Sequence, residues 1–156
     1  MLKIKSMAHK AIDIAKTLTT FVNAEYGDFL SNLKIQKLLY YAQGLSLVLH
    51  HKPLFEEKII AWQYGPVVEE VYHELKTFSN GPITIENHNN DFLSDDELDL
   101  LREVYDVFGQ FSATKLVEMT HSENPWKTTT IRSEITHPKL EKHFITLVTN
   151  EQTEKI

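Results

Sequence analysis

The fold is decided by residues 31–50, whose sequence is SNLKIQKLLYYAQGLSLVLH. Ser31 or Asn32 is suited to cap a helix that continues to about His50. Pro53 follows, and a proline disfavours helical geometry in the residue before it. Apolar or aromatic side chains occupy most of the circumference of this helix, which is typical of a helix at the centre of a fold. We therefore predict a buried central helix.

Five further helices are predicted from apolar residues at helical spacing and from cap and stop signals. Ser94 and Glu97 fit a capping box, in which the two residues satisfy each other's free backbone N–H. Residues 80–93 are expected to form an exposed loop, and Ile59–Trp62 a short extended piece, but no segment indicates a sheet. The five helices run from about Met7 to Tyr26, Pro66 to Phe78, Ser94 to Gln110, Ser112 to His121 and Pro138 to Asn150.

The expected fold class is therefore all-α, with about six helices around a central hydrophobic helix. A chain of 156 residues has the usual size of one domain. We expect a single compact domain over residues 1–156, with a core at about 8–148, a short N-terminal lead and a frayed C-terminal tail. Five glycines and five prolines leave little material for a turn-rich sandwich or barrel.

Composition excludes several classes of protein. Cysteine is absent, which excludes disulfides, thiolate zinc sites and cysteine nucleophiles. No apolar stretch of signal-peptide or membrane-spanning length follows the basic N-terminus, so we expect a cytoplasmic protein. The formal net charge of -6 argues against general affinity for nucleic acid or an anionic membrane.

Charge is unevenly distributed along the chain. Residues 1–60 carry a balance of +3 and residues 61–156 a balance of -9. Two explanations remain open for the acidic part: solvated helix faces, or an acidic surface that meets a basic partner.

No residue pattern specifies an enzyme, a metal site or a phosphate loop. The eight histidines lack metal-ligand spacing, and the adjacent His50 and His51 would point about 100° apart on a helix. No serine stands in a Gly-x-Ser-x-Gly elbow, and Gly65-Pro66 lacks the other residues of a P-loop. The two arginines lie outside any basic cluster, which disfavours a DNA-binding helix-turn-helix. We expect no catalytic residue, no cofactor and no metal.

Aromatic and amide side chains outside simple helix stripes are the remaining unusual feature. Aromatic residues in connections either seal the ends of a bundle or dominate a protein–protein interface. Buried amides must be hydrogen-bonded, so they either fix a loop by bonding its backbone or face a binding groove. The aromatic residues are Tyr40, Tyr41, Trp62, Tyr64 and Trp126, and the amides are Gln36 and Gln43.

Four segments share a pattern with a known family: LKIQKLLYYAQG at 33–44, PLF at 53–55, AWQYGPVVEEVY at 61–72 and THSENPW at 120–126. They resemble the Panacea antitoxin domain, whose members include SocA-type antitoxins and phage-associated GepA-like proteins. The resemblance covers about residues 8–148. It implies an all-helical domain from bacteria or their phages that neutralises a toxin encoded beside it, usually by direct binding.

The resemblance and the aromatic residues together predict a non-enzymatic antitoxin that holds its toxin in an inactive complex. The toxin's active site would be occluded or distorted by a preformed helical surface, with the acidic face as a secondary steering element. Two alternatives are a proteolytic adaptor that delivers the toxin to a protease, and a small enzyme that reverses toxin damage. The candidate partner-binding residues are Tyr40, Tyr41, Trp62, Tyr64, Tyr72, His121 and Trp126.

Overall fold

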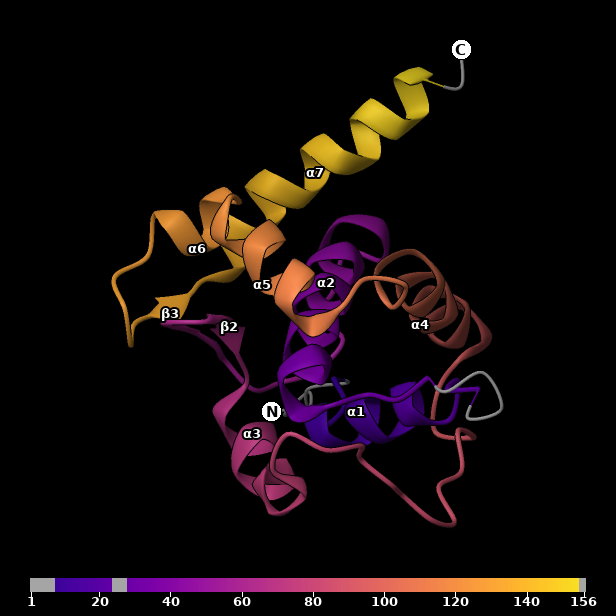
Figure 1. Cartoon of the computed structure of the whole chain (residues 1–156). Helices are drawn as coiled ribbons and strands as arrows, with labels where there is room; N and C mark the ends of the chain where they lie inside the picture. The colour runs from indigo at the N-terminus through magenta and orange to yellow at the C-terminus, as the bar shows by residue number, and fades with distance from the viewer. Residues whose placement is uncertain (1–7, 24–27, 155–156) are drawn as a thin grey trace, which may run out of the picture.

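The structure of the chain is a computed structural model that describes residues 8–23 and 28–154. Its centre is helix α2, Asn32–Leu49, which confirms the prediction of a buried central helix. Ser31 caps this helix, because its hydroxyl accepts a hydrogen bond from the backbone N–H of Lys34 at 3.2 Å. Figure 1 shows α2 running through the middle of the molecule with the other helices arranged around it.

Six further helices occur in the described part of the chain. The capping box at Ser94 and Glu97 is confirmed, and so is the cap that Ser112 provides. None of the helices in the described ranges combines the length and the apolar character that a membrane crossing needs. The six are α1 (Ala11–Thr19), α3 (Glu69–Leu75), α4 (Asp95–Phe108), α5 (Ala113–His121), α6 (Asn124–Lys127) and α7 (His137–Glu154), and a 3-10 turn, Lys76–Phe78, extends α3.

Helix α1 is shorter than the predicted segment at 7–26. Both ends of that segment lie outside the described residues, as does Gly27, which the sequence predicts to stop the helix because glycine accepts the left-handed conformation found at helix ends. The residues directly flanking α1 are described and are not helical. On the N-terminal side, the backbone N–H of His9 donates to Leu54 O and the backbone N–H of Glu56 donates to His9 O, each at 3.0 Å. The helix begins after His9 because this bridge uses its backbone groups in extended geometry.

A three-stranded antiparallel sheet corrects the all-α prediction, so the fold is mostly helical rather than purely helical. Strand β1 coincides with the extended piece expected from the sequence, whereas the other two strands were not predicted. The strands are β1 (Ile59–Trp62), β2 (Gly65–Val67) and β3 (Glu134–Ile135), in the order β2-β1-β3.

The sequence predicted that Pro66 begins a helix, but Pro66 lies in β2. Side chains of α2 explain the difference. The carbonyl of Pro66 accepts a hydrogen bond from Lys37 Nζ at 3.1 Å. The backbone N–H of Val68 donates to Gln36 Oε1 at 2.8 Å. These bonds hold 66–68 in extended geometry, and α3 begins only at Glu69.

The sequence predicted no helix at Asn124, whereas the structure has the short helix α6 there. Pro125 lies in the first turn of α6, where its missing N–H costs no hydrogen bond. The preceding helix, α5, ends at His121, which confirms its predicted end.

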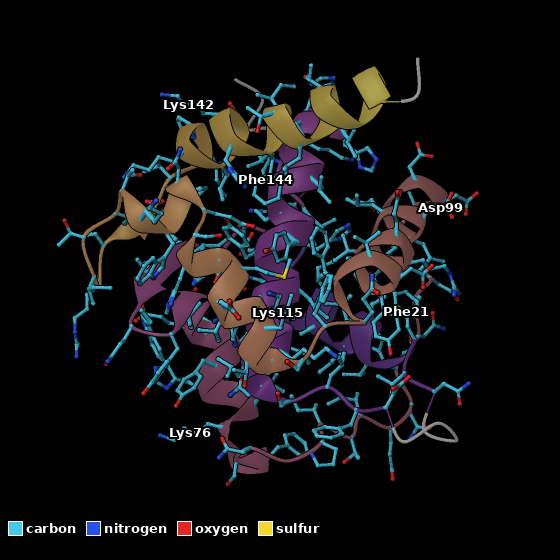
Figure 2. The ribbon with its side chains drawn as sticks, turned by 45° about the horizontal axis from the view of Figure 1, so that its top comes forward. Phe21, Lys76, Asp99, Lys115, Lys142 and Phe144 are labelled. Atoms are coloured by element: carbon cyan, nitrogen blue, oxygen red, sulfur yellow. The ribbon has the colours of Figure 1, made fainter. Side chains whose placement is uncertain are left out.

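Helix α7 crosses α2 at a glycine. A Cβ at Gly44 would lie 2.2 Å from the ring of Phe144, so no larger residue fits without displacement. Figure 2 shows Phe144 directed from α7 toward α2, whereas Lys142 on the same helix points away. Phe144 is fully buried and therefore docks the C-terminal helix on the core.

Candidate partner-binding groove

Three of the predicted contact residues, Trp62, Tyr64 and Tyr72, line one open groove of about 770 Å³. Trp62 and Tyr64 belong to the β1–β2 hairpin, and Tyr72 belongs to α3. Leu33 from α2 and Ile131 from the connection before β3 add to the apolar lining. Segments that are distant in sequence thus meet on one surface.

The aromatic residues of the groove differ in how tightly they are held. The rings of Trp62 and Tyr72 meet edge to face, with centroids 4.8 Å apart. Trp62 Nε1 also donates a hydrogen bond to Glu69 Oε2 at 3.1 Å, which fixes the indole. Tyr64 is 64% exposed and its hydroxyl has no hydrogen bond within the described residues, so its ring and its hydroxyl are both available to a partner.

His121 and Trp126 lie behind the hairpin and support it. Trp126 Nε1 donates to Trp62 O at 2.8 Å, and His121 Nε2 lies 2.9 Å from Gln63 O. A carbonyl only accepts, so Nε2 of His121 carries the proton. The two rings stack on each other with centroids 4.1 Å apart. Both side chains are half-buried and position the hairpin rather than line the groove.

The two buried glutamines fix loops by bonding loop backbone, which confirms the first of the two interpretations offered for them. Gln36 accepts from the backbone N–H of Val68, and its amide donates to Asn32 Oδ1. Gln43 Oε1 accepts from the backbone N–H groups of Leu54 and Phe55, at 2.8 and 3.2 Å. Gln36 also lines the groove, so the same amide joins the central helix to the groove floor.

Lys37 is a fully buried cation beneath the hairpin that the sequence analysis did not single out. Burial lowers the pKa of its ammonium to about 7. Its hydrogen bond to Pro66 O ties β2 to α2. Gly65 passes directly over it, with φ of 110° and room for no side chain, since a Cβ would lie 2.8 Å from Lys37 Cε.

Tyr40 and Tyr41, the two remaining predicted contact residues, are fully buried. Their hydroxyls donate to the two carboxylate oxygens of Glu123, each at 2.9 Å. Tyr41 also stacks on Phe108 at a centroid distance of 3.8 Å. Neither tyrosine presents a surface to a partner, because both are committed to the core.

Glu123 was not singled out from the sequence, although it stands within THSENPW at 120–126. Burial raises the pKa of its carboxyl group, and the bonds from the two tyrosines oppose that shift. His143 Nε2 lies 3.8 Å from Glu123 Oε1 and has no hydrogen-bond partner in the part of the chain that the structure describes. Burial lowers the pKa of this imidazole. The cluster therefore joins α2, the start of α6 and α7 in one polar contact inside the core.

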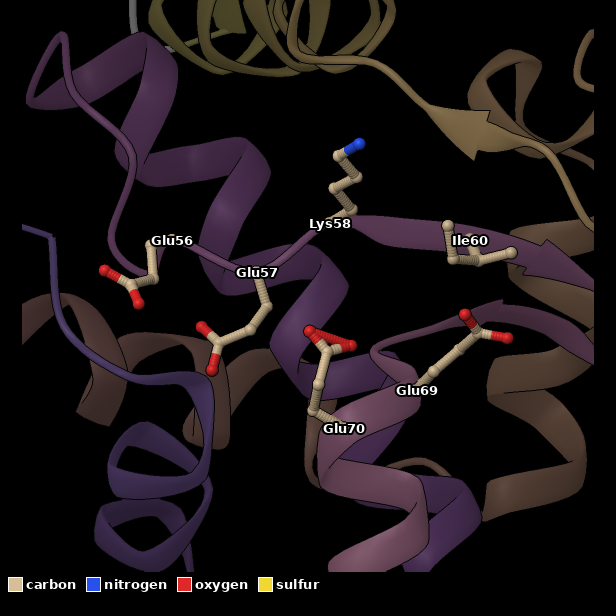
Figure 3. A pocket seen from close by; sticks show the side chains of 6 residues that line it. All are labelled: Glu56, Glu57, Lys58, Ile60, Glu69 and Glu70. Carbon is tan, nitrogen blue, oxygen red and sulfur yellow. The ribbon is translucent and has the colours of Figure 1, made fainter.

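A second hollow is acidic. Figure 3 shows the carboxylates of Glu57, Glu69 and Glu70 around it, with Lys58 pointing away. Glu57 is already engaged, because its Oε1 accepts the backbone N–H of Ala11 at 2.9 Å. Among the described residues, no group of three or more acidic or histidine side chains is arranged to hold a metal ion.

Comparison with known proteins points to one family. The family model described as "Antitoxin SocA-like, Panacea domain" matches residues 35–127. Antitoxin SocA of Caulobacter vibrioides (strain NA1000 / CB15N) is 38% identical over an alignment of 112 residues, and the match covers 62% of this chain and 58% of that protein. The chain thus spans less than two thirds of the length of that relative. No solved structure matches the chain at a significant level.

Proposed function

The chain belongs to the SocA-like Panacea-domain family of antitoxins, and on that premise we propose that it neutralises a toxin protein by binding it directly. The toxin would be the product of the neighbouring gene, and the complex would form in the cytoplasm. The antitoxin acts without catalysis, by covering or distorting the active site of the toxin.

The observation that carries this proposal is the convergence of Trp62, Tyr64 and Tyr72 on one groove. Binding energy at protein interfaces is concentrated in a few aromatic and arginine side chains near the centre of the contact. Two of these rings are held by each other and by Glu69, so little ordering entropy is lost when a partner docks. Trp62, Tyr64 and Tyr72 are therefore the contact residues that we propose, with His121 and Trp126 as supports.

An acidic face remains a proposed steering element. Helix α4 carries exposed carboxylates along its outer side, and Figure 2 shows Asp99 pointing away from the molecule. Such a face speeds the approach of a basic partner more than it adds to final affinity.

The test begins with co-expression of the chain and the product of the adjacent gene. We expect rescue of growth, co-purification of a stoichiometric complex, and no rescue when the antitoxin is at trace level. Full rescue at trace level without a complex would favour the enzyme alternative. Rescue that disappears in a protease-deficient host would favour the adaptor alternative.

Two substitutions separate binding from packing. Tyr64→Ala should weaken binding to the toxin by about 1–2 kcal/mol or more and leave the melting temperature unchanged, because the ring is exposed. Tyr41→Ala should instead cost about 3–5 kcal/mol of unfolding free energy, since it removes a buried ring. A Tyr64→Ala variant that binds like the parent would remove the groove from the proposed interface.

A further inference from the structure

The groove carries unpaired positive charge on an acidic protein. Lys76 and Arg132 both line it, are exposed, and form no ion pair within the described part of the chain. The acidic residue in the groove lining is Glu69. One oxygen of its carboxylate already accepts the indole N–H of Trp62. The formal net charge of the chain is -6, so the groove is more positive than the protein as a whole.

Exposed apolar surface lies beside these cations. Leu33 is 38% exposed, Ile131 47% and Tyr64 64%, and all three line the same groove. Contiguous apolar surface rimmed by polar groups marks interaction sites on soluble proteins. The groove therefore offers apolar contact and two free cations to one ligand.

The backbone holds Arg132 in a costly conformation at the mouth of the groove. Its φ is 76°, a left-handed value that is uncommon for a residue with a side chain. The backbone N–H of Arg132 donates to Ala61 O at 2.7 Å, and the backbone N–H of Ala61 donates to Ser133 O at 3.0 Å. These bonds to β1 tie the backbone of Arg132 to the hairpin that carries Trp62 and Tyr64.

We propose that this groove binds a segment of the toxin in which an acidic side chain stands next to apolar ones. The carboxylate would pair with the guanidinium of Arg132 and with Lys76, and the apolar neighbours would cover Tyr64, Leu33 and Ile131. An arginine fork matches a carboxylate in two parallel hydrogen bonds, which adds specificity to the charge pair. This inference rests on the proposed function and names the part of the toxin that is recognised.

The surroundings favour a protein segment over a nucleic acid. Glu69 lines both this groove and the acidic hollow of Figure 3, where Glu57 and Glu70 also lie. A nucleic acid bound along the two cations would place further phosphates near these carboxylates, which would repel them. A protein segment with a single acidic side chain between apolar groups carries no further negative charge, so it avoids this repulsion.

Charge reversal tests the inference. Arg132→Glu and Lys76→Glu should each raise the Kd for the toxin on the order of tenfold or more, measured with toxin refolded from the purified complex. Lys142→Glu is the matched control, because Lys142 is an exposed lysine that points away from the body on α7 (Figure 2). If a reversed variant melts early, Arg132→Gln and Lys76→Gln replace it, and the expected loss has the same direction.

A charge swap gives the sharper result. Synthetic peptides that tile the toxin sequence should include one that binds through an acidic residue, lose affinity when that residue becomes lysine, and regain it with Arg132→Glu. Failure of the parent protein to bind the toxin would overturn the proposed function itself. Equal toxin binding by the parent, Arg132→Glu and Lys76→Glu would overturn the inference and leave the proposed function standing. Retention of duplex or single-stranded DNA that depends on these two cations, without loss of toxin binding, would also overturn it.

Discussion

Lys37 shows at the scale of one residue how the core supports the groove. Its ammonium is buried, has no carboxylate partner among the described residues, and donates to Pro66 O at the base of the hairpin. Burial of a cation is unfavourable unless the group is neutralised or bonded. The lowered pKa of about 7 is the consequence, and it makes stability depend on pH.

We predict that the free energy of unfolding rises with pH above 7 because of Lys37. Between a folded pKa of about 7 and the ordinary value of 10.5, the unfolded chain holds a proton that the folded protein has released. Unfolding therefore takes up a proton, and stability grows by up to ~1.4 kcal/mol per pH unit in that window. Below pH 7 both states carry the proton and this contribution is flat.

The measurement is urea unfolding at intervals from pH 6 to 9.5. Lys37→Met keeps an unbranched side chain that is one atom shorter and removes the titrating group, so its profile should rise less steeply than that of the parent above pH 7. All other ionisable groups are common to the two proteins. Parallel profiles would show that Lys37 titrates normally.

At the scale of elements, the packing of α7 against α2 depends on one residue from each helix. Phe144 occupies the space that a side chain at position 44 would need, so the glycine sets how closely the helices approach. Glu123 and His143 add a polar contact at the same junction, next to the buried hydroxyls of Tyr40 and Tyr41.

Gly44→Ala should therefore cost about 1–3 kcal/mol of unfolding free energy through overpacking. In a Phe144→Ala background the same change should be neutral or favourable, because space is then available and alanine is the better helix former by about 1 kcal/mol. Chemical denaturation of the parent, the two single variants and the double variant gives the interaction free energy between positions 44 and 144. An identical cost of Gly44→Ala in both backgrounds would mean that the ring does not limit the approach of the helices.

For the whole molecule we predict stability without a bound metal. The chain has no cysteine, and no group of metal-binding side chains occurs within the described residues. A chelator in excess should therefore leave the melting temperature unchanged within about a degree. A clear decrease on chelation that one added metal reverses would contradict this, because a metal that binds the folded state stabilises it.

Local signals determined a large part of the architecture from the sequence. Ser31, Ser94 and Ser112 cap the helices that they were expected to cap, because capping depends on residues within one turn. The apolar circumference of 31–50 placed that helix at the centre for the same local reason. The segments around this helix indicated the family, and the sequence predicted Trp62, Tyr64 and Tyr72, which line one groove, among the contact residues.

The tertiary structure alone decided which residues share a surface. Strand β3 pairs with β1 from a distant part of the chain, and two residues of strand have no periodicity to read. Pro66 follows β geometry because Lys37 bonds its carbonyl, which no neighbour in sequence could reveal. Tyr41 and Tyr64 are the same residue type, yet Tyr41 is buried against Phe108 and Tyr64 lies exposed at the groove. Burial is set by what packs from elsewhere in the chain, and so the sequence supplied the candidate contact residues while the fold separated core from surface.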